Sequence, residues 1–163
     1  MTPSPHYKPI MQSNITWQCT RFSDLSVTQL YTILAARSEV FVLEQNCVYQ
    51  DMDGKDQASL HLTAWTTEQQ VAAYLRIVPP GLTFTEASLG RVITSKDARG
   101  TGIGKQLLAK GLEQLQITYP GQPVRIGAQH YLEKFYQSFG FMTVSDIYLE
   151  DDIPHVEMLR SAD

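Results

Sequence analysis

Hydrophobic residues occur along the chain in two patterns, short continuous runs and helical spacings, and the short runs predict β-strands. The strand candidates are short runs rich in β-branched and aromatic residues. Two of them, at 60–67 and 70–78, are separated by only two residues, which favours a hairpin. The predicted strands cover residues 15–22, 60–67, 70–78, 87–94 and 124–128, followed by the segments "FMTVS" and "HVEMLR".

Apolar residues spaced three or four positions apart predict three helices between these strands. The first spans "SDLSVTQLYTILAARSEVFVLEQ", in which Ser26 and Gln29 have the spacing of a capping pair. The second follows "SKDARGTGIGK" and should end at "YPGQP", because proline and glycine interrupt helices. The third is "YLEKFYQSF", which Gly140 should close. The apolar positions of the first two are Leu30, Ile33, Leu34, Val40 and Phe41, then Ile103, Leu107, Leu108, Leu112 and Leu115.

The predicted elements follow the order β-α-β-β-β-α-β-α-β-β. This order favours an α/β fold of the α+β type, a mixed and mostly antiparallel sheet flanked by helices, over a doubly wound parallel sheet. The chain has 163 residues, which fits one domain, expected at 14–163. Residues 1–13 contain three prolines and are expected to form a flexible leader, with Met1 and Met11 both open as starts.

Composition excludes several broad classes. The net charge of −4 argues against general nucleic-acid binding. No apolar run reaches the roughly 18 residues that a membrane span needs, and the first residues lack the apolar core of a secretory signal. Cys19 and Cys47 are too few for a disulfide framework or a zinc site, so we expect reduced thiols in a cytoplasmic protein. The stretch "DMDGKD" fails the calcium-loop pattern, because Asp56 and Leu62 occupy its glycine and glutamate positions. No metal is expected.

The stretch "RGTGIGK" at 99–105 is typical of a phosphate-binding loop. It fails the Walker pattern, because Arg99 stands at the first glycine position and Gln106 replaces the serine or threonine. It fails the Rossmann pattern because Lys105 occupies the third glycine position. The template [RQ]-x-x-G-x-[GA] fits Arg99, Gly102 and Gly104, after a strand and at a helix start.

With this template the chain resembles the GNAT superfamily of N-acetyltransferases, whose loop binds the pyrophosphate of an acyl-CoA. Glycines let backbone N–H groups approach a phosphate, and the helix start adds a positive dipole end. Between residues 89 and 110, Arg91, Lys96, Arg99, Lys105 and Lys110 face only Asp97, which supports an anion site. The resemblance implies acetyl-CoA as cosubstrate, bound by Val92, Ile93, Thr94, Arg99, Gly100, Thr101, Gly102, Ile103, Gly104, Lys105 and Tyr136. In the family, the end of the preceding strand carries a bulge whose backbone binds the pantetheine arm and could polarise the thioester carbonyl.

The stretch "FYQSFGF" strengthens the resemblance, because it matches a second family segment in which Tyr136 would be the general acid. A phenol with a pKa near 10 keeps its proton at neutral pH and can pass it to a departing thiolate. The alternative is that Tyr136 is a core aromatic among Phe135, Phe139 and Phe141.

Two further segments resemble the ElaA-like subgroup, over roughly residues 14–160. "RSEVFVLEQNCVYQDMDGKD" followed by His61 matches R-x-x-V-F-V-x-E-Q-x-x-x-Y-x-(E/D)-x-D…D…H. The segment "YLEDDIPHVEM" matches the pattern E-D-G-I-P-H that the subgroup has near its C-terminus, except that Asp152 replaces the glycine. This replacement leaves the geometry of the local turn open.

The resemblance implies direct acetyl transfer to a primary amine of a small molecule or peptide, with no nucleic-acid or membrane partner. Glu44, His61 and His155 are the acceptor-side candidates, with His130 a further possible base and Glu44 a catalytic candidate. A cation-attracting mouth could be formed by Glu44, Asp51, Asp53, Asp56, Glu150, Asp151 and Asp152. The alternatives are a non-catalytic CoA-binding sensor or interaction module on the same fold, an acylated Cys47, and a nucleotide-binding enzyme. A homodimer is considered only by analogy with other GNAT proteins, many of which dimerise.

Overall fold

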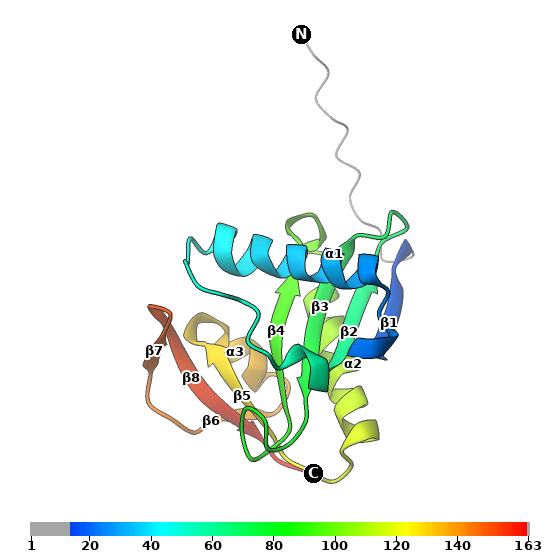
Figure 1. Cartoon of the computed structure of the whole chain (residues 1–163). Coiled ribbons are helices and arrows are strands. Elements are labelled where there is room, and N and C mark those ends of the chain that lie inside the picture. Colours follow the sequence, from blue (N-terminus) through cyan, green and yellow to red (C-terminus); the bar gives the residue numbers. More distant parts are fainter. Residues whose placement is uncertain (1–13, 163) are drawn as a thin grey trace.

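The computed structural model describes residues 14–162, which form two β-sheets and their flanking helices (Figure 1). The first sheet is antiparallel and has the strand order β1-β2-β3-β4. The second has the order β5-β8-β6, and β7 also pairs with β8. The strands are β1 (Thr16–Arg21), β2 (Leu60–Trp65), β3 (Val71–Val78), β4 (Ser88–Thr94), β5 (Val124–Gln129), β6 (Phe141–Thr143), β7 (Tyr148–Glu150) and β8 (Ile153–Arg160).

Helix α1 (Val27–Ser38) covers one face of the first sheet, across the upper ends of the strands in Figure 1. Ser26 and Gln29 form the predicted capping box, each side chain bonding the other residue's backbone N–H. Ile33 is fully buried in a small cluster with Trp65, Val71, Tyr74 and Ile93. The predicted helix is α-helical only as far as Ser38, and Glu39–Glu44 continues it as a π-helical segment.

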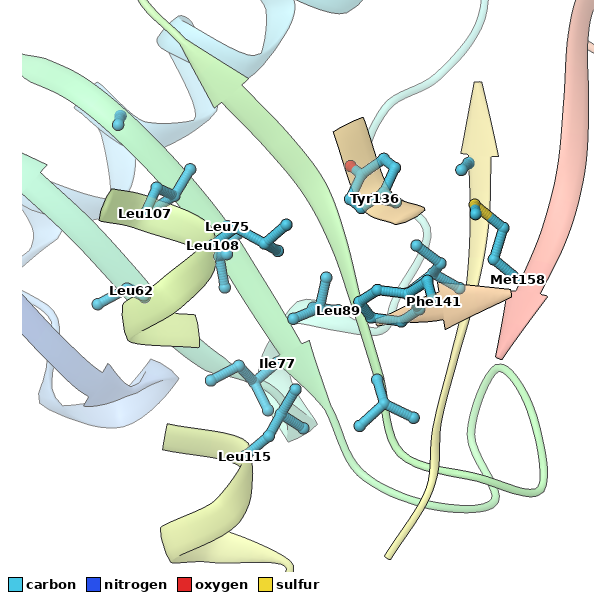
Figure 2. Close-up of a cluster of buried hydrophobic side chains, with 14 of the residues drawn as sticks. Leu62, Leu75, Ile77, Leu89, Leu107, Leu108, Leu115, Tyr136, Phe141 and Met158 are labelled. Carbon is cyan, nitrogen blue, oxygen red and sulfur yellow. The ribbon is translucent and has the colours of Figure 1, made fainter. Parts of the chain in front are cut away.

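Helix α2 (Ile103–Thr118) covers the opposite face and ends where the proline and glycine predicted a stop. Its apolar side faces β3 and β4, and the core continues into the second sheet through Phe141 and Met158 (Figure 2). Gly111 permits the close approach of α2, since an added Cβ there would lie 2.8 Å from Leu75 Cδ2. Alternation along β3 places Leu75 on this side and Tyr74 on the side of α1.

The two sheets meet at one end and separate at the other. Ala87 and Val124 form a single parallel bridge, and the Arg125 backbone N–H donates to the Ala87 carbonyl at 3.0 Å. Beyond it β4 and β5 diverge (Figure 1). β4 also carries a bulge: Tyr74 pairs with Ile93 and Arg76 with Gly90, so one residue of β3 faces two of β4. The geometry therefore opens a gap beside an irregular strand.

The predicted fold class is confirmed, with two local corrections. The segment "YLEKFYQSF" is helical only over a 3-10 turn, His130–Leu132, and the short α3, Glu133–Gln137. β7 was missed, and it forms a hairpin with β8 around Asp151 and Asp152, which have φ values of 48° and 62°. Aspartate tolerates this left-handed region, so Asp152 fills the glycine position.

Three short 3-10 turns complete the described elements, at Phe22–Asp24, Asp56–Ala58 and Lys96–Ala98. No helix in residues 14–162 is long and apolar enough to cross a membrane. The predicted leader, 1–13, lies outside the described residues.

Candidate active site

A cleft of about 900 Å³ occupies the gap between β4 and β5. One wall comes from β4 and the π-helical segment, and the other from β5, α3 and the β7–β8 hairpin. Of the residues predicted to bind acetyl-CoA, the cleft is lined by Val92, Ile93, Thr94, Arg99, Gly104 and Tyr136. It thus brings together the two motifs that the sequence separates by about thirty residues.

The glycine-rich loop enters α2 through two left-handed residues, Gly100 at φ 80° and Gly102 at φ 83°. Thr101 Oγ1 donates to the Ala98 carbonyl at 2.6 Å, which closes the preceding turn. Gly104 lies close to β4, since an added Cβ would meet Thr94 Cγ2 at 3.7 Å. This loop offers the start of a 16-residue helix, a geometry suited to an anion such as a pyrophosphate.

The remaining loop residues lie outside the cleft wall. Ile103 points into the core with 2% of its surface exposed, so only its backbone could serve a ligand. Lys105 is exposed on the first turn of α2, and Gly100, Thr101 and Gly102 form the loop itself.

The cluster of positive charge expected at this loop is smaller than the sequence predicted. Arg91 turns toward the aspartates of residues 51–56, and the Lys110 ammonium lies over the Trp17 ring, 5.2 Å from its centroid. Lys96, Lys105 and the half-exposed Arg99 stay near the loop.

Tyr136 lies on α3 with only 5% of its surface exposed. Its ring meets Phe135 and Phe141 edge to face, at centroid distances of 5.4 and 5.9 Å. Burial, with a smaller contribution from Tyr131, raises the pKa of Tyr136 well above its ordinary value. Tyr136 is therefore both a core aromatic and a residue of the cleft wall, and it keeps its proton at neutral pH.

Glu44 lies at the end of the π-helical segment and pairs with Arg99 of the glycine-rich loop. Its Oε2 accepts from Arg99 Nη2 at 2.6 Å, and the same nitrogen donates to the Thr94 carbonyl at 3.0 Å. Both residues line the cleft. If Glu44 accepted a proton, this ion pair would be lost, so its predicted role as a base competes with its contact to Arg99.

His61 does not reach the cleft, which corrects its prediction as a substrate-binding residue. It is 1% exposed, with Nε2 2.9 Å from the Asp56 carbonyl and Nδ1 2.7 Å from the Tyr74 hydroxyl. A carbonyl only accepts, so Nε2 carries the hydrogen and the Tyr74 hydroxyl donates to Nδ1. Burial lowers the pKa of His61 and favours this neutral form.

His155 on β8 does line the cleft, as an acceptor-side residue would. Its Nδ1 lies 2.7 Å from the Ile153 carbonyl, and its Nε2 lies 3.4 Å from Glu150 Oε2. The imidazole also stacks on Tyr148 at a centroid distance of 5.9 Å. The other histidine considered, His130, is exposed on the 3-10 turn before α3.

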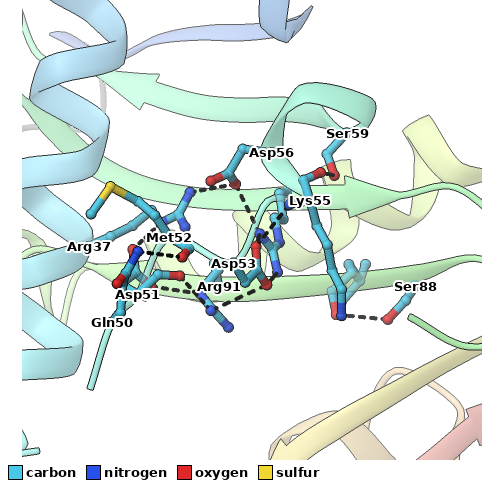
Figure 3. A network of polar contacts seen from close by, with 12 residues as sticks. Arg37, Gln50, Asp51, Met52, Asp53, Lys55, Asp56, Ser59, Ser88 and Arg91 are labelled. Carbon is cyan, nitrogen blue, oxygen red and sulfur yellow. Dashed lines mark hydrogen bonds and ion pairs between the residues drawn. The ribbon is translucent and has the colours of Figure 1, made fainter. Parts of the chain in front are cut away.

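The predicted acidic mouth is corrected in part, because four of its seven carboxylates pair with arginines: Asp51, Asp53 and Asp56 in one network (Figure 3), and Glu44 with Arg99. Asp56 Oδ1 accepts from Arg37 Nη1 at 2.7 Å and from Arg76 Nη1 at 2.9 Å. Asp53 forms a two-bond pair with Arg76. Within residues 14–162, the mouth carboxylates that have no arginine partner are Glu150, Asp151 and the neighbouring Asp152.

The ion pairs lower the pKa of two aspartates in this network. Burial alone would raise the pKa of Asp56, but its hydrogen bonds and charge contacts with Arg37 and Arg76 outweigh burial and lower it. At Asp53 burial is likewise outweighed, chiefly by Arg76, and the pKa falls far below its usual range. Both groups are therefore carboxylates at neutral pH.

The sequence did not predict two contacts that cross the cleft. The amides of Gln45 and Gln129 bond each other reciprocally at 3.2 and 3.3 Å, joining the end of the π-helical segment to β5. Cys47 Sγ lies 3.4 Å from the Asp151 carbonyl, across to the β7–β8 turn. Gln45 and Asp151 both fall within the subgroup patterns, which was the only sequence signal for these contacts. In residues 14–162, no three His, Cys, Asp or Glu side chains group as a metal site.

Comparisons with known proteins agree with this geometry. Residues 22–161 match the family model described as an acetyltransferase (GNAT) domain. The chain is 46% identical to protein ElaA of Escherichia coli over 148 residues, 90% of this chain and 96% of ElaA. The crystal structure of E. coli ElaA superposes with a TM-score of 0.85 at 44% identity, covering 90% of this chain and 99% of that chain.

A crystal structure of an acyl-CoA N-acyltransferase from Pseudomonas aeruginosa also superposes closely. Its TM-score is 0.86 at 41% identity, and the match covers 90% of this chain and 99% of that one. The loop at the start of α2, the cleft between two diverging strands and these matches lead to one conclusion. The chain is an acyltransferase and belongs to the GNAT acetyltransferase family, close to ElaA.

Proposed function

We propose that this protein transfers an acetyl group from acetyl-CoA directly to a primary amine of a small molecule or peptide, with Tyr136 as general acid. The observation that carries the proposal is the shared cleft, which Tyr136 lines from α3 and the phosphate-type loop borders through Arg99 and Gly104. Acetyl-CoA requires an anion site at one end and a proton donor near its sulfur. The family match supplies the class of reaction.

The proposed chemistry has one bond-forming and one bond-breaking step. The amine nitrogen attacks the thioester carbon, so that a C–N bond forms and the carbonyl oxygen gains negative charge. The C–S bond then breaks, and the thiolate takes the Tyr136 proton. Burial raises the pKa of Tyr136, so the phenol holds its proton throughout the neutral range and has it available for the thiolate. The amine gives up a proton to solvent or to a base, and the Tyr136 phenolate takes a proton back from solvent, so that the protons balance over one turnover.

This chain's backbone supplies the other proposed contacts. The left-handed loop and the start of α2 would bind the pyrophosphate, assisted by Arg99 and the exposed Lys105. The bulged part of β4, with Val92, Ile93 and Thr94, would bind the pantetheine arm and polarise the thioester carbonyl. A bulge takes one residue out of the strand ladder and leaves its backbone groups for another partner.

The acceptor side is proposed to lie between the π-helical segment and the β7–β8 hairpin. Glu44, Glu150 and Asp151 line this part and would favour a cationic amine. Glu44 or a water relay is the proposed route for the amine proton, and His155 a positioning contact. The proposed cosubstrate suits a cytoplasmic location, where acetyl-CoA is available.

Binding and turnover test this proposal in sequence. Thermal shift should show stabilisation by acetyl-CoA and CoA and none by ATP, since a ligand at 100 times its Kd adds about 2.7 kcal/mol. A panel of alkylamines, polyamines and short peptides is then assayed for CoA thiol release. No stabilisation by either CoA species would contradict the proposal. Stabilisation without thiol release for any amine would favour a non-catalytic CoA-binding sensor.

A further inference from the structure

The residues that mark the subgroup in sequence gather around a single arginine in the structure. Asp51 and Asp53 lie on the loop after the π-helical segment, Phe41 within that segment, and Tyr49 between them. All four contact Arg91 of β4, which lies 40 positions after Asp51 in the sequence. Figure 3 shows the aspartates converging on the arginine from the loop. The segment 41–53 thus holds one residue of β4, Arg91, although the two are far apart in the sequence.

Arg91 belongs to the β4 bulge. Arg91 has a φ of 51°, in the left-handed region that side-chain-bearing residues rarely adopt. Arg91 and Val92 together face Leu75, because the register changes between the Arg76–Gly90 and Tyr74–Ile93 pairs. Strained backbone of this kind persists only where its surroundings fix it.

The surroundings fix Arg91 through its guanidinium. Its Nε donates to Asp51 Oδ1 at 2.7 Å, and its Nη2 donates to the Asp51 carbonyl at 2.8 Å. Nη2 also lies 3.5 Å from Asp53 Oδ2. The rings of Phe41 and Tyr49 lie 5.9 and 6.0 Å from the guanidinium carbon, within cation–π range.

Asp51 is in turn held from the other side. It is 3% exposed, and its second oxygen accepts from Arg37 Nε at 2.8 Å. Arg37 belongs to α1 and is fully buried. Asp51 therefore links α1 to the bulge, through hydrogen bonds to two charged groups.

We propose that Asp51 is a positioning residue for acyl transfer, which acts by holding Arg91 and with it the backbone of the β4 bulge. The inference rests on the proposed function, because the bulge is the part of β4 that would meet the thioester. Asp51 itself does not line the cleft, so it acts only through Arg91. The acidic loop of the subgroup pattern would then anchor the reaction site, since its carboxylates Asp51, Asp53 and Asp56 are all paired with arginines.

The test compares Asp51→Asn and Arg91→Lys with Asp56→Asn as the matched control. Asp56 lies in the same network and also binds two guanidinium groups, but neither belongs to Arg91. Both aspartate variants should lower the melting temperature. Each protein is assayed well below its own melting temperature, with the amine that gives most turnover at saturating acetyl-CoA.

Asp51→Asn and Arg91→Lys should lower kcat about tenfold or more, because a misplaced oxyanion donor costs that much. KM for acetyl-CoA should change less, and Asp56→Asn should keep kcat near the parent value. Arg91→Gly relieves the backbone strain and removes the anchor, so it should also lose kcat. Equal kcat in Asp51→Asn and Asp56→Asn, or full kcat in Arg91→Gly, would overturn the proposal.

A second readout does not need an acceptor. If the bulge binds the thioester carbonyl, the parent protein should prefer acetyl-CoA over CoA in calorimetric titration. Asp51→Asn should lose that preference, and Asp56→Asn should retain it; retention in both would overturn the positioning role. A parent protein that releases no thiol with any amine would overturn the proposed activity, and the two failures are therefore distinguishable.

Discussion

Replacing Tyr136 with phenylalanine removes one hydroxyl from the cleft and leaves the packing of the ring unchanged. The edge-to-face contacts with Phe135 and Phe141, at 5.4 and 5.9 Å, belong to the ring and persist in Tyr136→Phe. The free energy of unfolding should therefore change by no more than about 1 kcal/mol. The Kd for CoA should also be nearly unchanged, because the loop proposed to bind the pyrophosphate is untouched.

Turnover is expected to respond far more strongly. A general acid contributes about 100- to 10,000-fold, so kcat should fall by that order in Tyr136→Phe. The pH profile offers a second check. Burial raises the pKa of Tyr136 above its ordinary value of about 10, so the parent kcat should show no loss from phenol ionisation below about pH 10.

The assay is thiol release from acetyl-CoA with the best amine, measured from pH 6 to 10 alongside calorimetric CoA binding. Tyr131→Phe serves as the control, because Tyr131 lines the same cleft but is 74% exposed. A kcat in Tyr136→Phe within about threefold of the parent, far from the loss expected of a general acid, would refute the acid role. Loss of CoA binding together with kcat would show that the hydroxyl maintains the site instead.

Three further outcomes follow from the packing and the charges. The free energy of unfolding should fall as the pH drops below about 4, because the lowered pKa of Asp56 gives stability that is present above its unfolded pKa and lost on protonation; urea titrations at pH 7, 5 and 3.5 measure this. Glu44→Gln should tighten CoA binding by up to about fivefold, since it releases Arg99 from a part-exposed ion pair, measured by calorimetry. Gly111→Ala should lose about 1 kcal/mol in chemical denaturation, because the new methyl lies 2.8 Å from Leu75 Cδ2 and this crowding exceeds the gain in helix propensity.

Each of these outcomes has a control. Asp56→Asn should show a weaker acid dependence than the parent, and an equal dependence would contradict the assignment. Glu39→Gln changes the net charge equally but removes no ion pair with Arg99, so equal tightening would indicate general electrostatics. Gly104→Ala adds a methyl at an ordinary 3.7 Å contact on the same helix, so a stability loss as large as in Gly111→Ala would contradict the crowding argument.

Local spacing in the sequence predicted the fold class and the position of the glycine-rich loop at the start of a helix. Helical period and capping placed α1 and α2, and short apolar runs bounded by turn residues placed β2 to β4, because these properties depend on neighbours within a few residues. The glycine spacing at 99–105 indicated the loop for the same reason. Prediction failed where the local signal was short or mixed, as at the exposed three-residue β7 and the π-helical turn after Ser38.

Only the tertiary structure decided which charges remain free. The sequence offered Asp51, Glu44 and His61 as acceptor-side groups, but Asp51 pairs with Arg91 across 40 positions and Glu44 with Arg99 across 55. His61 is buried on β2, where the Tyr74 hydroxyl and the Asp56 carbonyl bond its two ring nitrogens. The partner of an ionisable side chain is set by which distant segments the folded sheets bring within a few ångströms, and no local pattern in the chain records that choice.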